Sequence, residues 1–261
     1  NKNIFYHFKL LEKHFYELII EHSYTTLKYN KEFNNNKSDN KYYVFVVNNL
    51  DKLNIFKVYL LFYYANIYIY KKYVYIGVDF EFNTKVVALM QLNFEQPNLE
   101  LYNYSLIFLF YPGFLDNKWK YFFAKKILCN KFVYKILHGS DALDIPYIYN
   151  ELLEKNPDHI RKFNEAFIDS KFLCEYNYYQ NGQELGKCKI YYILLLQEII
   201  TKNKFDFLLK NEQLMGPIYD IIININTLSD TLITYTLYDV VFLEKLVSHF
   251  KMKSDNFNLI N

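Results

Sequence analysis

Cysteine is scarce in this sequence, and so is any excess of charge of one sign. The 261 residues include three cysteines, Cys129, Cys174 and Cys188, and no CxxC pair. Such an odd, scattered set argues against a disulfide scaffold or a zinc ribbon and favours a reducing compartment. The formal net charge is only +2, whereas a protein that coats nucleic acid carries a clear basic excess. Near-neutrality therefore favours an enzyme over a packaging protein.

Long apolar runs and internal repeats are also missing. The most apolar stretch, residues 58–70, is too short and too interrupted for a membrane span. It is predicted to be the end of a helix that runs into a strand. A chain of this length favours one domain with an accessory segment.

Tyrosine and phenylalanine are abundant, with 28 and 24 copies among many Asn, Lys and Ile residues. All these residues have A/T-rich codons, so the aromatic content indicates an AT-rich genome and is not evidence for base stacking. A large DNA virus or an AT-rich protist fits this bias. We expect an intracellular protein, with the nucleus and the virion of such a virus as two candidate places.

The periodicity of apolar residues predicts a mixed α/β sheet flanked by helices. A helix over residues 4–29 and a polar linker over 30–41 precede the main domain, 42–250, and a tail, 251–261, follows it. Ser229 is the expected N-cap of the last helix. The other predicted strands are 42–47, 73–82, 86–92, 106–111, 132–137 and part of 167–172, and the other helices are 48–64, 119–128, 145–153, 190–200 and 230–250.

Asp79 and Glu81 form the first candidate site, in the segment YIGVDFEFN. Alternation along a strand places both carboxylates on one face, with Phe80 on the opposite face. Two acids so close in a buried strand repel each other unless a cation lies between them. Metal binding is therefore the simplest interpretation, and two solvated acids at a strand end are the alternative.

Two further segments carry candidate carboxylates. In HGSDALDIP, residues 138–146, an apolar strand leads through a turn into a helix, and Asp141 and Asp144 compete for one role. Tyr235 and Asp239 are four residues apart on the last helix, so they share one face of it. For each segment the alternative is structural: helix capping for the aspartates, and a Tyr–Asp hydrogen bond for the last pair.

Together these segments resemble the three motifs of the DEDDy 3′–5′ exonucleases, and specifically those of ribonuclease D and its relatives. The motifs occur in the family's order over residues 42–250, and the segment FIDS, residues 167–170, is similar to the one that follows the second motif. The second motif is one residue longer than the usual pattern, which keeps both Asp144 and Asp141 open. Residues 202–227 lack the Trp- and Arg-containing segment common in ribonuclease D, so RNA and DNA both remain candidate substrates.

The resemblance implies a ribonuclease H-like fold with two divalent ions, Mg²⁺ or Mn²⁺, as cofactors. It also implies hydrolysis at a single-stranded 3′ end, with release of nucleoside 5′-monophosphates. A nucleic-acid-binding or virion structural protein that retains the fold without catalysis is the alternative. The residues that the family pattern assigns are Asp79, Glu81, Asp144 and Asp239 for the ions, Tyr235 for aiming the attacking water, and Phe80, Phe82 and His138 for the nucleic acid.

Overall fold

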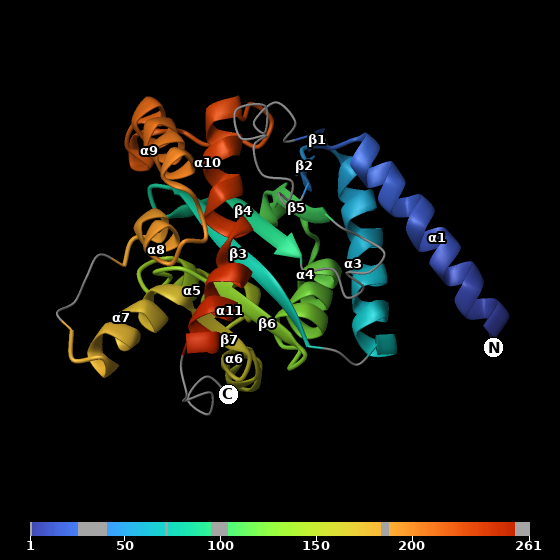
Figure 1. The fold of residues 1–261 in the computed structure, drawn as a ribbon. Coiled ribbons are helices and arrows are strands. Elements are labelled where there is room, and N and C mark those ends of the chain that lie inside the picture. The colour runs from blue at the N-terminus through green and yellow to red at the C-terminus, as the bar shows by residue number, and fades with distance from the viewer. Residues whose placement is uncertain (1, 26–40, 71–72, 95–103, 184–187, 254–261) are drawn as a thin grey trace.

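One mixed sheet forms the centre of the protein. The computed structural model describes residues 2–25, 41–70, 73–94, 104–183 and 188–253. Within them seven strands lie in the order β1-β2-β5-β4-β3-β6-β7 (Figure 1). The strands are β1 (Tyr24–Thr25), β2 (Lys41–Val47), β3 (Val74–Asn83), β4 (Val86–Phe94), β5 (Tyr104–Phe110), β6 (Val133–Leu137) and β7 (Phe167–Asp169).

Strand direction changes three times across this sheet. β3, β4 and β5 are successive antiparallel neighbours, whereas β6 runs parallel to β3 and β7 runs parallel to β6. On the far side β2 runs parallel to β5, and β1 is antiparallel to β2. The predicted mixed α/β sheet is confirmed, and β3, which carries the first candidate carboxylates, lies inside it with neighbours on both sides.

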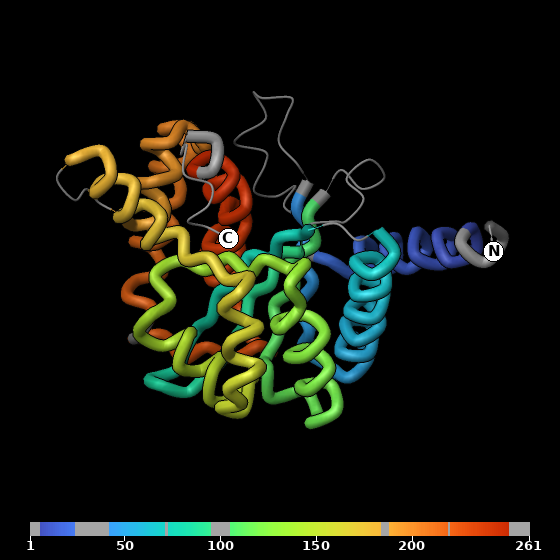
Figure 2. The backbone as a smooth tube through the Cα atoms, turned by 90° about the horizontal axis from the view of Figure 1, so that it is seen from below, coloured from blue at the N-terminus to red at the C-terminus, as the bar shows by residue number. Residues whose placement is uncertain are grey.

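Helices cover both faces of the sheet and bury a separate apolar layer on each (Figures 1 and 2). The layer with Phe108 and Phe110 of β5 packs against α3 (Leu50–Tyr70), α4 (Asn117–Phe122), the π-helical turns η2 (Phe123–Leu128) and η3 (Ile148–Leu152), α5 (Asp144–Tyr147) and α6 (Pro157–Asn164). The other layer packs against α7 (Ser170–Gln180), α8 (Ile190–Leu196), α9 (Lys202–Met215), α10 (Asp230–Val241) and α11 (Leu243–Lys253). Two short 3₁₀ turns complete the elements, η1 (Pro112–Phe114) and η4 (Ile218–Asp220).

The N-terminal helix packs against the rest of the fold. The helix predicted over 4–29 is α1 (Lys2–Glu21), and the chain then forms β1 at the edge of the sheet. The amide of Asn66 in α3 donates to the buried carboxylate of Glu12, and Lys9 donates to the same carboxylate at 2.7 Å. Polar contacts thus fix α1 against α3, although α1 extends beyond the rest of the molecule (Figure 2). The predicted linker falls mostly on residues 26–40, outside the described ranges.

The structure corrects two of the predicted elements. The apolar stretch 58–70 is helical throughout, because α3 continues to Tyr70, so the expected strand there is wrong. The long last helix is two helices, which meet at Phe242. The strand expected within 167–172 is present as β7, and α7 begins directly after it at Ser170. No helix in the described ranges is long and apolar enough to cross a membrane.

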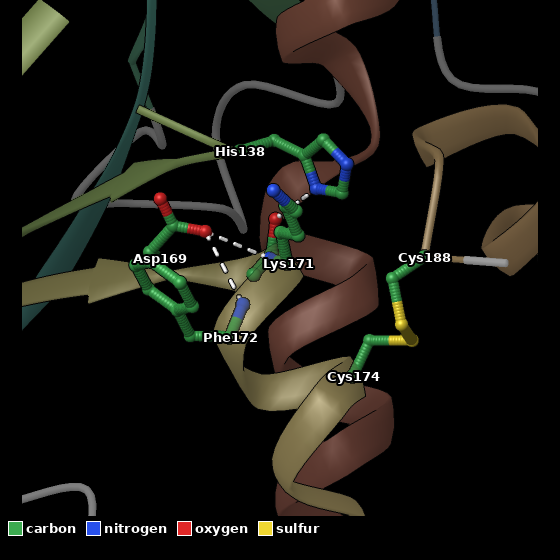
Figure 3. The surroundings of a disulfide bond; sticks show 7 residues. His138, Asp169, Lys171, Phe172, Cys174 and Cys188 are labelled. Atoms are coloured by element: carbon green, nitrogen blue, oxygen red, sulfur yellow. Dashed lines mark hydrogen bonds between the residues drawn. A yellow bond between two sulfur atoms is a disulfide. The ribbon is translucent and has the colours of Figure 1, made fainter. Parts of the chain in front are cut away.

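A disulfide joins Cys174 of α7 to Cys188, just before α8 (Figure 3). The cysteine count predicted no disulfide scaffold, and one bond between two neighbouring segments is not a scaffold. It does argue against the expected reducing compartment, because lasting disulfides are typical of oxidising surroundings. An odd number of cysteines cannot reveal one local pair, since pairing depends on how the chain folds back to join two cysteines with a sequence separation of 14. Cys129 is free and buried.

Candidate metal site

Two acids of β3 point to the same face of the sheet, as the alternation of the strand predicts. Asp79 pairs across the strands with Gln91 of β4, and Glu81 follows two residues later. The amide Nε2 of Gln91 donates to Asp79 Oδ2 at 3.3 Å and to Glu81 Oε1 at 3.1 Å. Gln91 is fully buried, so it holds both carboxylates from within the sheet.

Helix α10 brings the third acid, Asp239, onto this face. Ser229 caps the helix by accepting the N–H of Leu232, as predicted, and α10 crosses in front of β3 and β4 (Figure 1). Gly77 of β3 permits the close approach, because a Cβ at this position would lie 2.7 Å from the backbone oxygen of Val240. One carboxylate oxygen each from Asp79, Glu81 and Asp239 then lies within 4.8 Å of the others.

The electrostatics of the cluster disfavour charge in the metal-free protein. Burial raises the pKa of Asp79 to about 7. Burial, followed by the charges of Asp79 and Asp239, raises the pKa of Glu81 well above its usual range. Burial and then the charge of Asp79 raise the pKa of Asp239 in the same way. Neighbouring carboxyl groups of this kind resist ionisation because their negative charges would repel each other. A cation bound between them stabilises the ionised, carboxylate form.

Asp144 lies beside this cluster, and Asp141 does not lie inside it. Asp144 is 9% exposed at the start of α5, whereas Asp141 is exposed in the preceding turn. Burial, followed by the charge of Asp79, raises the pKa of Asp144 to about 8. The charge of Asp144 also acts on Glu81. Asp144 is nevertheless not one of the three acids whose oxygens meet within 4.8 Å.

The turn before Asp144 is fixed by Asp169 at the end of β7. Its carboxylate accepts the N–H of Gly139 at 3.0 Å and both the N–H and the hydroxyl of Ser140, at 2.9 and 2.8 Å. Burial opposes ionisation of Asp169, but these donors outweigh it and hold its pKa below the usual value. Gly139 has a φ of +66°, a conformation that favours glycine. The segment FIDS thus positions the second candidate motif.

Two phenol groups reach Asp239. The hydroxyl of Tyr235, one turn earlier in α10, hydrogen-bonds to its carboxylate. Tyr191 of α8 donates to Asp239 Oδ1 at 3.3 Å. The charge of Asp239 and then burial raise the pKa of Tyr235, and burial followed by the charge of Asp239 raises that of Tyr191. Both phenols therefore keep their protons at neutral pH.

The three residues predicted to contact nucleic acid lie around this cluster without joining it. Phe80 is 4% exposed and packs with its ring 5.3 Å from that of Tyr147 in α5, while Phe82 beside it is half-buried. His138 Nδ1 lies 2.9 Å from the hydroxyl of Ser170 (Figure 3), and the backbone of Cys188 lies beside its ring. Burial lowers the pKa of His138 to about 4. The contacts of His138 hold the turn that leads to Asp144. A contact of any of the three residues with nucleic acid stays a prediction.

Sequence reasoning missed Gln91 and Tyr191, the two polar residues that touch the candidate ligands from other elements. Gln91 is one of two polar residues, with Asn93, in the otherwise apolar run VVALMQLNF, which is unusual for a strand that is buried from Ala88 onward. Tyr191 carries no such signal among so many tyrosines. The acids themselves suit a hard divalent cation, since carboxylate oxygens are the ligands that Mg²⁺ and Mn²⁺ prefer.

Comparison with known proteins gives one sequence relative. Protein L533 of Acanthamoeba polyphaga mimivirus, which is uncharacterized, is 35% identical over 244 residues, covering 88% of this chain and 46% of L533. The chain therefore spans about half the length of this viral relative. No protein-family model matches the chain.

A solved structure of a ribonuclease D shares its fold. Ribonuclease D of Trypanosoma brucei in complex with GMP matches with a TM-score of 0.51 and 18% identity, over 82% of this chain and 58% of that protein. The exonuclease domain of Aedes aegypti Nibbler matches with a TM-score of 0.45 and 14% identity, over 74% of this chain and 84% of that domain. The match to the trypanosomal enzyme shows that the chain has the ribonuclease H-like fold of the DEDDy 3′–5′ exonucleases. The predicted fold is confirmed.

Proposed function

We propose that this chain, which has the exonuclease fold, is a metal-dependent 3′–5′ exonuclease. It would hydrolyse terminal phosphodiester bonds of RNA or single-stranded DNA and release nucleoside 5′-monophosphates. The observation that carries the proposal is the meeting of Asp79, Glu81 and Asp239 within 4.8 Å on a sheet with the fold of ribonuclease D.

The residues that would hold divalent ions are these three acids, with Asp144 as the fourth. Mg²⁺ or Mn²⁺, with two ions as the family pattern implies, would supply charge neutralisation and a nucleophilic water at neutral pH. Asp144 is the better fourth residue than Asp141, because it is buried beside Asp79 while Asp141 is exposed. Because Asp144 is not one of the three acids whose oxygens meet within 4.8 Å, it would bind its ion through water.

Tyr235 would orient the attacking water by its hydroxyl. A phenol with its pKa raised by a neighbouring carboxylate keeps its proton, so it suits orientation better than proton removal. Phe82, whose ring is only half-buried, would contact the terminal nucleotide, with Phe80 supporting it from behind. His138 would contribute indirectly, through the turn that leads to Asp144.

The test is degradation of an oligonucleotide labelled at its 5′ end, with RNA and DNA of one sequence in parallel. In Mg²⁺ or Mn²⁺ the protein should shorten the substrate stepwise from the 3′ end and release 5′-monophosphates. Asp79→Asn combined with Glu81→Gln should abolish the reaction, because two of the ligands lose their charge. Asp141→Asn is the matched control and should retain activity, whereas Asp144→Asn should lose most of it.

Unchanged degradation by the double variant would reject the proposal. A folded wild-type protein that binds neither Mn²⁺ nor Mg²⁺ in a calorimetric titration would favour the alternative, a nucleic-acid-binding or virion protein that keeps the fold without catalysis. The ratio of the rates on RNA and DNA decides the substrate, which the site geometry leaves open.

A further inference from the structure

Asp239 receives a hydrogen bond from outside its own motif. Tyr191 lies on α8, a different helix, and its hydroxyl donates to Asp239 Oδ1 at 3.3 Å. The side chain is 6% exposed, so this hydroxyl is aimed into the cluster and not into solvent. Tyr235 approaches the same carboxylate from within α10. Two phenols on two helices thus restrain one carboxylate.

Helix α8 is tied to α7 just before its first residue, and its buried Ile193 and Leu194 pack in the apolar layer. Lys189 is at the N-cap position and makes no side-chain capping hydrogen bond. The residue before it, Cys188, forms the disulfide with Cys174 of α7 (Figure 3), and its backbone lies beside the ring of His138. A covalent bond and a contact with His138 therefore fix the chain three residues before Tyr191.

Both the disulfide and His138 are connected to the turn that carries the second motif. His138 starts this turn, and Ser170, whose hydroxyl lies 2.9 Å from His138 Nδ1, starts α7. The disulfide then leaves from Cys174, one turn further along α7. Asp144 and Tyr191 are thus positioned from one rigid junction of β6, β7 and α7.

We propose that Tyr191 is a positioning residue for the Asp239 carboxylate, and that the Cys174–Cys188 disulfide fixes the helix from which it acts. This inference rests on the proposed function, since it takes Asp239 as a metal ligand. A donor that holds a ligand carboxylate decides which of its lone pairs face the ion, and losing such a partner typically weakens metal binding by about 10–100-fold. A phenol that only satisfies a buried carboxylate would have no such effect.

The first experiment is calorimetric titration with Mn²⁺ of the wild-type protein and of Tyr191→Phe, at a temperature where thermal unfolding shows both to be folded. We expect the dissociation constant to rise about tenfold in Tyr191→Phe. Tyr179→Phe, which removes the same hydroxyl from an 81% exposed position on α7, is the control and should leave the constant unchanged. Equal affinity of wild type and Tyr191→Phe overturns the inference. No Mn²⁺ binding by the wild type overturns the proposed function instead.

The nuclease assay supplies a readout that a purely structural role would not change. If Tyr191 positions a ligand, the Mn²⁺ concentration for half-maximal rate rises in Tyr191→Phe, and saturating Mn²⁺ restores most of the wild-type rate. A uniformly lower rate with the same Mn²⁺ requirement contradicts the positioning role.

The disulfide is tested by combining variants. Replacing Cys174 and Cys188 with alanine should also weaken Mn²⁺ binding, because the start of α8 loses its covalent anchor. If the anchor acts through Tyr191, the triple variant binds Mn²⁺ about as weakly as Tyr191→Phe alone, since effects on one shared contact do not add. Fully additive losses, or unchanged affinity in the cysteine variant, would contradict this part of the inference.

Discussion

Gln91 shows how one buried amide serves two carboxylates. Its Nε2 donates to Asp79 and Glu81, whereas its Oε1 has no hydrogen-bond partner among the described residues. A buried acceptor without a partner costs stability, on the order of 1–3 kcal/mol. The presence of this amide is therefore better explained by the orientation of the two acids than by the stability of the sheet.

Replacing Gln91 with methionine should separate these two effects. The side chain keeps a similar volume and loses its donor, so the carboxylates lose their shared restraint. We expect the affinity for Mn²⁺ to fall by about 10–100-fold, measured by calorimetry. The unfolding temperature of the metal-free protein should stay within a few degrees of wild type, because the unpaired acceptor is lost as well.

Asn93 offers the matched control for this change on the same strand. Its amide is buried too, but it donates to the carbonyl of Val240 at 3.3 Å and touches neither acid of β3. Asn93→Leu removes one contact of β4 with α10, so it should lower stability and weaken Mn²⁺ binding less than Gln91→Met does. A loss of affinity in Asn93→Leu as large as in Gln91→Met would show that general disturbance of β4 is the cause.

At the scale of elements, the site depends on how closely α10 packs against β3. The methyl group of Gly77→Ala would lie 2.7 Å from the backbone oxygen of Val240, next to Asp239. A backbone oxygen cannot turn away as the end of a flexible side chain could, so the two elements would have to move apart. Overpacking of this kind typically costs about 1–3 kcal/mol. We expect Gly77→Ala to lower the unfolding temperature and to weaken Mn²⁺ binding together, since α10 must move away with its ligand.

Gly182→Ala tests whether any glycine replacement would have the same effect. This residue has a φ of +61° in an exposed turn, and a Cβ there meets nothing within 4 Å. The variant should lose some stability through backbone strain and keep its Mn²⁺ affinity. Wild-type affinity in Gly77→Ala would mean that the contact of α10 with β3 does not set the position of Asp239.

Features that depend only on residues near one another in the sequence could be predicted. Alternation along β3 places Asp79 and Glu81 on one face whatever the rest of the chain does, and Ser229 caps α10 through its own neighbours. Contacts set by distant pairing could not be predicted. Gln91 reaches the acids only through the register of β4 against β3, and Tyr191 only through the placement of α8.

The predicted helix boundaries were wrong for a related reason. An apolar stretch such as 58–70 fits a buried helix and a buried strand equally well, and only its packing against the sheet makes it part of α3. The pair Cys174 and Cys188 is a similar case, because nothing local to either cysteine indicates that α7 and the start of α8 meet.

For the whole molecule, the acidic cluster links folding, pH and metal. Asp79 and Asp144 have folded pKa values of about 7 and about 8, above the usual 3.8, chiefly because of burial. Each acid therefore binds its proton more tightly in the folded protein than in the unfolded chain. The stability from this difference is complete below pH 3.8 and is lost as the pH rises through the folded values. A bound cation removes the loss by favouring the ionised forms.

Thermal unfolding, measured with Mg²⁺ and with a chelator, tests this linkage. The pH should run from about 5.5 to about 8.5, so that it passes through the folded pKa values of Asp79 and Asp144. We expect Mg²⁺ to raise the unfolding temperature more at the higher pH than at the lower one. Each kcal/mol gained corresponds to about 2–4 °C for a domain of this size. Lys135 also titrates in this range, with its pKa lowered by burial to about 7, whereas the folded pKa of His138, lowered by burial to about 4, lies below it. Both residues contribute equally with and without Mg²⁺. In Asp79→Asn/Glu81→Gln the Mg²⁺ effect should vanish, and a shift equal at both pH values in the wild type would disprove the linkage.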